Sequence, residues 1–229
     1  MSLPVAASCL ERNAWICGEY ITSRKDTILG DLREHVMLTV VAVVAGFLIS
    51  IPLSLLVRRF RRTETTVIGL TSVLYGVPSV ALFAILVPIT GLTATTVEIG
   101  LTIYTLVIFV RNNLAGLDSV PPDVRDAAAG MGMGSLRMLL RVDLPLALPA
   151  IIAGLRVATV STIALVTVGA LVGTGGLGQE LNDAFSSYFK AEALTASVLC
   201  VLLALAADLL IVGLGRLLTP WDRASRRQR

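Results

Sequence analysis

The stretch VMLTVVAVVAGFLISIPLSLLV, residues 36–57, decides the class of fold to which this chain belongs. It contains 22 residues, none of them charged. At 1.5 Å per residue, a helix of this length spans about 33 Å, which is enough to cross the ~30 Å hydrocarbon core of a bilayer. The run ends at RRFRR, residues 58–62, and such basic clusters stay on the cytoplasmic side of a membrane. The stretch therefore predicts a transmembrane helix.

Further apolar segments follow, so the predicted fold is all-α, a polytopic membrane helical bundle with about five spans. The predicted spans are residues 36–57, 67–91, 95–113, 148–172 and 193–218. Gly76, Pro78 and Pro88 interrupt the second segment, for which we expect one kinked helix. Apolar residues recur at helical spacing across 177–188 and predict a short helix on the membrane surface.

Three regions follow from these spans: an N-terminal extracytoplasmic tail (1–34), a transmembrane domain (35–218) and a cytoplasmic basic tail (219–229). The composition agrees, because 55% of the residues are hydrophobic, 15% are charged and the mean hydropathy is +0.82. A soluble domain has about 25% charged residues. The net charge of +3 lies beside apolar runs, so it indicates topology and not a nucleic-acid partner.

The positions of the basic residues predict the orientation of the chain. With the N-terminus outside, the basic residues on the inner side are Arg58, Arg59, Arg61, Arg62, Arg111, Arg125, Arg137, Arg141, Arg216, Arg223, Arg226, Arg227 and Arg229. The outer loops then hold only Lys190, and the acids of the N-terminal tail offset its basic residues. Because positive charge collects on the cytoplasmic side, we expect five spans with the N-terminus outside and the C-terminus inside a bacterial inner membrane.

The cysteines leave one question open. Cys200 lies in an apolar run, where we expect a packed membrane residue. Cys9 and Cys17 lie in the N-terminal tail and are able to pair if that tail faces an oxidising compartment. The sequence does not decide whether they do.

The long inner connection, residues 121–145, carries a spaced motif. It contains Asp126-Ala127-Ala128, three residues, Gly132, nine residues, and then Val142-Asp143-Leu144-Pro145. This resembles the signature of binding-protein-dependent permeases of ATP-binding-cassette importers, which is Glu-Ala-Ala, three residues, Gly, nine residues and Ile-x-Leu-Pro. The spacing is the same, with Asp in place of Glu and Val in place of Ile.

The resemblance implies a coupling helix that docks on a separate ATPase subunit. The implied coupling residues are Asp126, Ala127, Ala128, Gly132, Val142, Leu144 and Pro145. Physical chemistry favours a short helix at the same place, because Pro121 and Pro122 suit a first helical turn. Asp123 and Asp126 are expected where the helix dipole favours acids, and Gly132 where the chain turns back to the membrane. An ordinary helix in a cytoplasmic loop is the alternative.

Three further segments resemble the osmoprotectant branch of this family, which imports betaines, choline or carnitine. They are residues 74–82 (LYGVPSVAL), 148–156 (LPAIIAGLR) and 173–178 (GTGGLG). The whole resemblance covers about residues 35–217. It implies a pair of permease subunits, identical or homologous, two ATPase copies, and an extracytoplasmic substrate-binding protein that delivers a small osmoprotectant.

Five residues inside the predicted spans are candidates for the pathway or its gate. Arg156 and Asp208 are charges inside spans, where such residues face a bundle interior or a cavity. An ion pair, including one with each other, is the structural alternative. Tyr75, Pro78 and Ser79 mark a weakened helix centre, where Pro78 frees carbonyl groups for a pore. A simple packing kink is the alternative there.

The sequence lacks the motifs that several other activities require. The chain has only two lysines, Lys25 and Lys190, and neither belongs to a P-loop, so ATP must be bound by a partner. The glycine run at 173–178 follows an apolar helix, not the strand of a dinucleotide-binding unit. His35 is the only histidine, which argues against a histidine metal cluster. We expect no catalytic residue, metal or cofactor in this chain.

Three other functions were weighed against the importer. A secondary transporter driven by an ion gradient would use Asp208 as its proton or cation site, but the sequence shows no inverted repeat. A non-transport membrane scaffold would not need the spaced motif. An intramembrane enzyme lacks a catalytic constellation.

Overall fold

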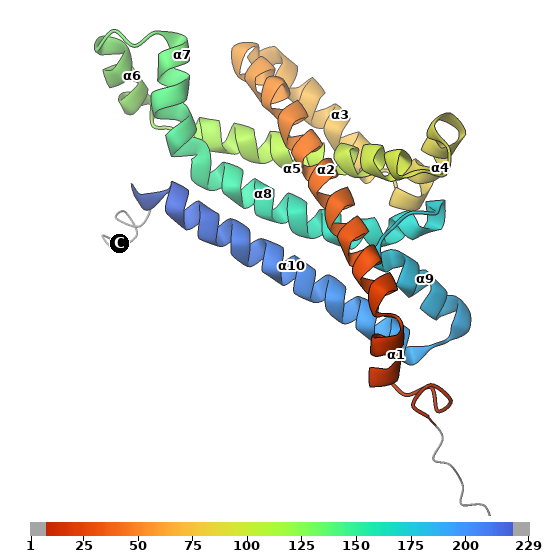
Figure 1. The fold of residues 1–229 in the computed structure, drawn as a ribbon. Coiled ribbons are helices and arrows are strands. Elements are labelled where there is room, and N and C mark those ends of the chain that lie inside the picture. The colour runs from red at the N-terminus through yellow and green to blue at the C-terminus, as the bar shows by residue number, and fades with distance from the viewer. Residues whose placement is uncertain (1–7, 222–229) are drawn as a thin grey trace, which may run out of the picture. The chain divides into compact units, whose positions relative to one another are not determined.

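The computed structural model describes residues 8–221 (Figure 1), and helices account for nearly all of them. The elements are α1 (Gly18–Ser23), α2 (Lys25–Arg59), η1 (Arg61–Thr63), α3 (Glu64–Gly76), α4 (Ser79–Thr90), α5 (Ala94–Asp118), α6 (Pro122–Gly130), α7 (Ser135–Met138), η2 (Leu139–Asp143), α8 (Leu144–Val166), η3 (Thr167–Val172), α9 (Leu177–Ser187) and α10 (Lys190–Leu218). No strand occurs between residues 8 and 221, which confirms the predicted all-α class. Most of the predicted basic tail, residues 222–229, lies outside the described residues.

Four helical stretches are long and apolar enough to cross a membrane by themselves. They are Lys25–Arg59, Ala94–Asp118, Ser135–Val172 and Lys190–Leu218. A fifth span is made if Arg61–Gly76 and Ser79–Thr90 count as one broken span. The predicted bundle of about five spans is therefore confirmed, with the second span in two pieces.

The single kinked helix predicted at 67–91 was wrong. Gly76 ends α3, and Val77 and Pro78 are both extended, with ψ angles of 128° and 136°, before α4 begins at Ser79. A proline disfavours the helical conformation of the residue before it, because its ring clashes with that residue's backbone. Pro88, in contrast, lies inside α4 without ending it. The chain therefore has a sharp break where only a bend was expected.

Other boundaries moved outward from their predicted positions. The helix expected at 36–57 begins at Lys25, so much of the predicted tail, 1–34, belongs to α1 and α2. Lys25, Arg33 and Glu34 have good helix propensity, and a hydropathy window does not detect a helix made of such residues. The short third apolar run becomes α5, a helix of 25 residues, as required for a span.

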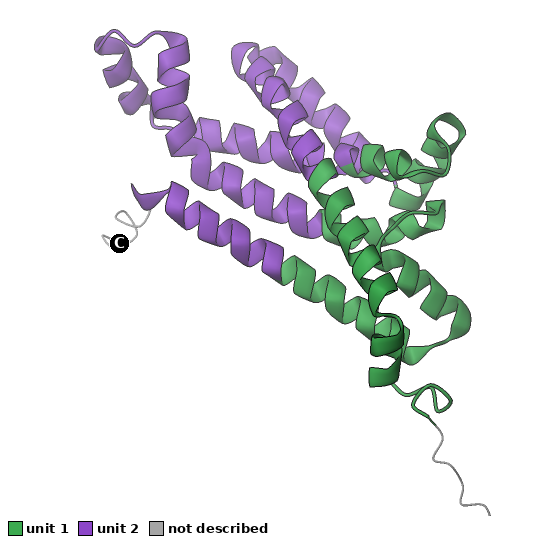
Figure 2. Cartoon of the chain, viewed as in Figure 1, with its two compact units in different colours: residues 1–41, 78–101, 162–205 green, residues 42–77, 102–161, 206–229 purple. Residues whose placement is uncertain are grey.

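The chain forms two compact units (Figure 2). Unit 1 holds residues 1–41, 78–101 and 162–205, and unit 2 holds residues 42–77, 102–161 and 206–229. Each of α2, α5, α8 and α10 contributes residues to both units. Unit 2 contains the whole spaced motif, and unit 1 contains the glycine run at 173–178.

In unit 1, the glycine run lets η3 and α9 pack closely on neighbouring backbone. A Cβ on Gly176 would lie 2.6 Å from the carbonyl oxygen of Asp31 and 2.6 Å from the Cβ of His35. His35 is fully buried, and its Nε2 lies 3.0 Å from the carbonyl oxygen of Ile163. The helix predicted at 177–188 corresponds to α9, but its apolar residues differ in burial. Leu177 is buried, whereas Tyr188 is 83% exposed.

Unit 2 packs its helices through small residues. A Cβ on Gly154 of α8 would lie 2.6 Å from the Cβ of Asn112 in α5. A Cβ on Gly116 of α5 would lie 2.8 Å from the carbonyl oxygen of Ala147, near the start of α8. Small residues permit close helix approach in membranes, where dispersion replaces the hydrophobic driving force. This packing holds α5 against α8. The segment with the spaced motif connects these two helices in the sequence.

Candidate coupling site and translocation pathway

Helix α6 forms where the sequence predicted a short helix. Pro121 precedes it, and Pro122 is its first residue, where the missing N–H costs no hydrogen bond. Asp123 lies in the first turn, where the helix dipole favours a carboxylate. Asp126 lies beyond the first turn, so the dipole argument made for it from the sequence does not hold. Another role has to account for this acid.

The turn after α6 needs a glycine at one position. The N–H of Met131 donates to the carbonyl of Ala127 (3.1 Å), and that of Gly132 donates to Ala129 (2.9 Å). Gly132 then adopts a φ of +77°, which side chains rarely tolerate. Nothing lies within 4 Å of the place where its Cβ would be. The backbone conformation, and not a neighbouring atom, therefore explains this glycine within the chain.

Of the two alanines of the motif, one is buried within unit 2 and the other is exposed. Ala128 is 2% exposed and is the only buried residue of α6. Asp126 and Ala127 are exposed. A helix of this length has room for one buried stripe and one solvent-facing stripe. The face that α6 leaves uncovered is therefore the one with Asp126 and Ala127.

A cavity of about 520 Å³ lies beside this exposed face. It is lined by Arg61, Leu117, Asp118, Val120, Pro122, Arg125, Asp126, Ala129 and Met138. Across it, Arg61 of η1 donates to Asp118 at the end of α5 (3.1 Å) and to Glu64 (3.3 Å). The hydrogen bond from Arg61 to Asp118, together with the charge of that carboxylate, raises the pKa of Arg61. Both partners are exposed, so the pair contributes little to stability.

The second half of the motif lies at the start of α8. Val142, Leu144 and Pro145 are half-buried. Asp143 is the last residue of a π-helical turn, η2, and its side chain is only 3% exposed. Arg58 of α2 donates to this carboxylate, and Nε of Arg125 in α6 lies 3.5 Å from its other oxygen. None of these three residues was predicted as a site residue, although an acid among apolar motif positions was an available signal.

The break between α3 and α4 contains the candidate gate residues Tyr75, Pro78 and Ser79. Tyr75 is 46% exposed, and its ring packs edge-on against Tyr104 with centroids 5.7 Å apart. The hydroxyl of Tyr104 donates to the carbonyl oxygen of Val77. The carbonyl of Val77, which the break leaves outside both helices, is thus already bonded within the chain. Pro78 precedes α4, and Ser79 is its first residue.

Arg156 of α8 and Asp208 of α10 form a fork-shaped ion pair with each other. Nε of Arg156 donates to one carboxylate oxygen (2.7 Å), and Nη2 donates to the other (2.9 Å). The side chains are 43% and 28% exposed in the single chain. Two parallel bonds fix the relative orientation of both groups and make a charge inside a span tolerable.

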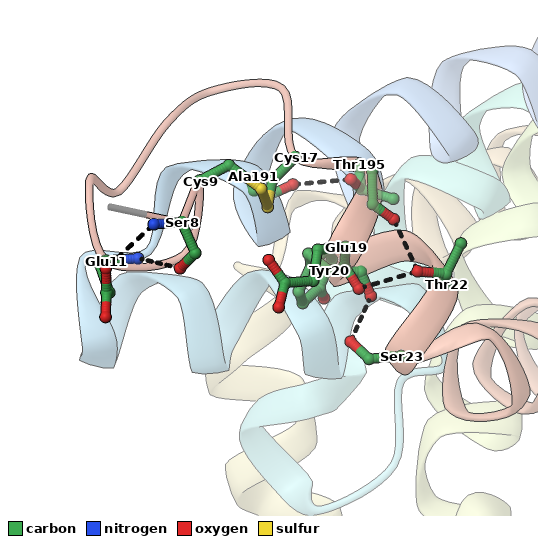
Figure 3. Close-up of a disulfide and its surroundings, with 11 residues drawn as sticks. Ser8, Cys9, Glu11, Cys17, Glu19, Tyr20, Thr22, Ser23, Ala191 and Thr195 are labelled. Carbon is green, nitrogen blue, oxygen red and sulfur yellow. Dashed lines mark hydrogen bonds between the residues drawn. A yellow bond between two sulfur atoms is a disulfide. The ribbon is translucent and has the colours of Figure 1, made fainter. Parts of the chain in front are cut away.

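A disulfide between Cys9 and Cys17 closes a loop in the N-terminal segment of unit 1 (Figure 3). This pairing was left open by the sequence. Cys17 is buried and packs with Tyr20, Ile28 and Ala191. The hydroxyl of Tyr20 donates to the buried carboxylate of Glu180 in α9. Burial, and then this hydrogen bond, raise the pKa of Tyr20 far above its usual value, so the phenol stays protonated.

Removing the disulfide is expected to loosen this segment. In the chain-entropy account, closing a loop of this length, with eight residues of sequence separation between the cysteines, is worth about 2–3 kcal/mol. In the variant Cys9→Ser with Cys17→Ser, amide hydrogen exchange of residues 9–23 should be faster than in the wild type. Dithiothreitol should speed this exchange in the wild type and leave the variant unchanged. Equal exchange in all four samples would contradict this expectation.

The profile of the family described as "Binding-protein-dependent transport system inner membrane component" matches residues 26–223. The chain belongs to this family. It is therefore a multi-pass membrane permease, the inner membrane component of a binding-protein-dependent transport system, as the spaced motif predicted.

Curated relatives of this permease carry the names of osmoprotectant transport proteins. It is 33% identical over 204 residues to the glycine betaine/carnitine/choline transport system permease protein OpuCD of Bacillus subtilis (strain 168), which covers 89% of each chain. It is also 33% identical over 192 residues to the osmoprotectant import permease protein OsmW of Salmonella typhimurium, covering 82% of this permease and 89% of that protein. The predicted resemblance to the osmoprotectant branch is confirmed.

Solved structures with the same fold come from more distant importers. A chain of the inward-facing MetNI methionine transporter matches with a TM-score of 0.78 and 21% identity, covering 86% of this permease and 98% of that chain. A chain of an amino acid ATP-binding-cassette transporter crystallised with histidines matches with a TM-score of 0.72 and 18% identity. These likenesses concern the fold and say nothing about the solute of this permease.

Proposed function

We propose that this permease moves a small osmoprotectant, such as glycine betaine, choline or carnitine, into the cell at the expense of ATP hydrolysed by a separate subunit. The names of the relatives at 33% identity support the solute class. The observation that supports the mechanism is α6, a short helix that holds Ala128 inside unit 2 and leaves Asp126 and Ala127 uncovered. Such a helix is suited to dock on a partner protein.

The ATPase partner is expected to contact the exposed face of α6. Short side chains at this face allow a close approach of the partner's backbone, and Asp126 offers a charge to its basic groups. One ATPase copy would bind each permease subunit. Closure of the two ATPases on ATP would then push both α6 helices and switch the pathway from inward-open to outward-open.

A second permease copy or homologue completes the pathway in this proposal, and a substrate-binding protein delivers the solute from outside. The most apolar window of α10 has only 6% of its residues buried within the chain, and its exposed leucines, among them Leu205 and Leu209, leave one apolar face for lipid or for a second subunit. Because most of the selectivity would lie in the binding protein, the permease itself needs no enclosed solute site.

The ion-gradient alternative receives no support from the structure of unit 2. It required Asp208 as an available proton or cation site. Both oxygens of Asp208 instead accept hydrogen bonds from Arg156. A carboxylate held by a guanidinium fork is a poor site for another cation.

The energy source is tested by reconstitution. The permease should be co-expressed with the ATPase and the binding protein of the same transport system, purified and placed in liposomes. We expect ATP-dependent uptake of radiolabelled glycine betaine, choline or carnitine by the full complex. The permease alone should neither hydrolyse ATP nor take up solute, because the chain has no P-loop. Uptake by the permease alone under a proton or sodium gradient would overturn the proposal.

The proposed orientation, with the N-terminus outside, is tested by cysteine labelling. Single cysteines replace Met131, which is 71% exposed, and Tyr188, which is 83% exposed, in a background with Cys9, Cys17 and Cys200 changed to serine. An impermeant thiol reagent should label position 188 in intact cells, and position 131 only after lysis. The reverse pattern would invert the topology.

A further inference from the structure

Asp143 connects two separate elements of unit 2 through a single carboxylate. One oxygen accepts a hydrogen bond from Nη2 of Arg58, near the end of α2. The other oxygen lies 3.5 Å from Nε of Arg125, in the middle of α6. Asp143 itself precedes α8 directly. The coupling helix, α2 and α8 therefore meet at this one side chain.

Packing does little to join these elements at this point. An open cavity of about 420 Å³ lies beside the ion pairs, and its lining includes Arg58, Arg125 and Asp143. Ala128 is the only residue of α6 buried in the chain. Arg125 adds a charged contact between α6 and the start of α8, an ion pair at 3.5 Å without a hydrogen bond.

The burial of the carboxylate makes this contact sensitive to its partners. The side chain of Asp143 is 3% exposed, and that of Arg58 is 15% exposed. A buried charge is tolerated only while its partners compensate for its desolvation. Nη1 of Arg58 is buried, and among residues 8–221 it has no hydrogen-bond partner, so Arg58 depends on Asp143 for compensation. By contrast, Arg125 is 44% exposed and is free to move with α6.

We propose that Asp143 is a positioning residue that transmits movement of α6 to α2 and α8, by holding Arg125 and Arg58 on one carboxylate. This inference rests on the proposed function, because it takes α6 as the helix that the ATPase moves. When the ATPase displaces α6, Arg125 pulls Asp143 with it. The ion pair between Asp143 and Arg58 then transmits the displacement to the end of α2. Without these ion pairs, α6 moves by itself, and α2 and α8 do not move with it.

The test measures coupling in the reconstituted full complex. Arg125→Gln removes the exposed arm of the link and leaves the buried Arg58–Asp143 pair intact, so the subunit should fold and assemble normally. We expect the number of solute molecules imported per ATP hydrolysed to fall about fivefold or more, the size of a typical coupling energy. Asp143→Asn removes both arms and leaves the buried Arg58 uncompensated, so it should lower the ratio at least as much and also lower the complex yield. Adding Arg125→Gln to Asp143→Asn should lower the ratio no further, because the contact of Arg125 is already lost.

Arg61→Gln is the matched control. It breaks an exposed ion pair at the same end of unit 2, with side chains that are 55% and 41% exposed, and should leave the import ratio unchanged. Asp143→Glu keeps the charge and should restore most of the coupling. A wild-type ratio in Arg125→Gln would overturn the inference. A lower yield of the Arg125→Gln complex with an unchanged ratio of solute imported per ATP hydrolysed would also overturn it, because that result indicates a structural role.

A solute-independent measurement separates this inference from the proposed function. A nitroxide label at Leu56 of α2, which is 43% exposed, reports movement of that helix. ATP should change its spectrum in the wild-type complex and in Arg61→Gln, but not in Arg125→Gln. If the complex imports no osmoprotectant while this pattern holds, the solute proposal fails and the link stands. If Arg125→Gln responds to ATP as the wild type does, the link fails whatever the solute.

Discussion

Gly132→Trp is expected to abolish solute uptake and release the ATPase, while the subunit stays in the membrane at normal abundance. At a φ of +77° a side chain costs about 1–2 kcal/mol, which a folded bundle tolerates. Within the chain, nothing lies within 4 Å of the Cβ position, so the start of the side chain meets no neighbouring atom. The bulk therefore projects where the proposed partner docks, and overpacking of a close interface costs about 1–3 kcal/mol. Uptake assays and co-purification of the ATPase measure the outcome.

Two matched variants separate bulk from backbone strain. Gly132→Ala adds the strain of a positive φ with little bulk and should keep most of the uptake. Gly134 also has open space around its Cβ position, but its φ is −68°. Gly134→Trp therefore adds the same bulk nearby without strain, and we expect a smaller loss. Normal transport by Gly132→Trp with the ATPase bound would show that α6 is not the coupling helix.

Asp208→Lys is expected to remove most of the subunit from the membrane and, with it, nearly all uptake. The change places a second cation beside Arg156, where the structure has a fork-shaped ion pair. Two like charges inside a span have neither a partner nor full hydration, which disfavours insertion and packing of α8 and α10. Quantitative immunoblots of membranes, together with uptake per amount of subunit, measure the result.

The exchange Arg156→Asp with Asp208→Arg distinguishes a structural pair from a pathway residue. The exchange restores opposite charges, so abundance should return toward the wild-type level. If uptake per subunit also returns, the pair serves the packing of unit 2. If abundance returns and uptake does not, the pair acts on the solute or the gate. Normal abundance of Asp208→Lys alone would contradict the importance of the pair altogether.

Much of the fold was accessible from local properties of the sequence. The uncharged run at 36–57 and the basic cluster at 58–62 indicate a span and its inner end without any knowledge of its neighbours. The short helix α6 was also predictable, because Pro121, Pro122 and Gly132 have conformational preferences that act within a few residues. The family follows from the spacing between Asp126 and Pro145, which is again a property of the chain alone.

The failures of prediction have equally local causes. A window of hydropathy does not detect that α2 starts at Lys25, because charged residues continue a helix as readily as apolar ones. It also does not distinguish a kink from a break. At Val77 and Pro78 the break is accompanied by a hydrogen bond from Tyr104, a residue of another helix, to the freed carbonyl of Val77.

By itself the sequence determined that this chain is a polytopic membrane protein with a coupling motif, because span length, charge placement and motif spacing are read along one dimension. Only the tertiary structure decided which charges meet. Arg156 and Asp208 are 52 residues apart in the chain, Arg58 and Asp143 are 85 apart, and Tyr20 and Glu180 are 160 apart. No local preference selects such partners. They are chosen by the packing of whole helices, which brings each buried charge to the group that compensates it.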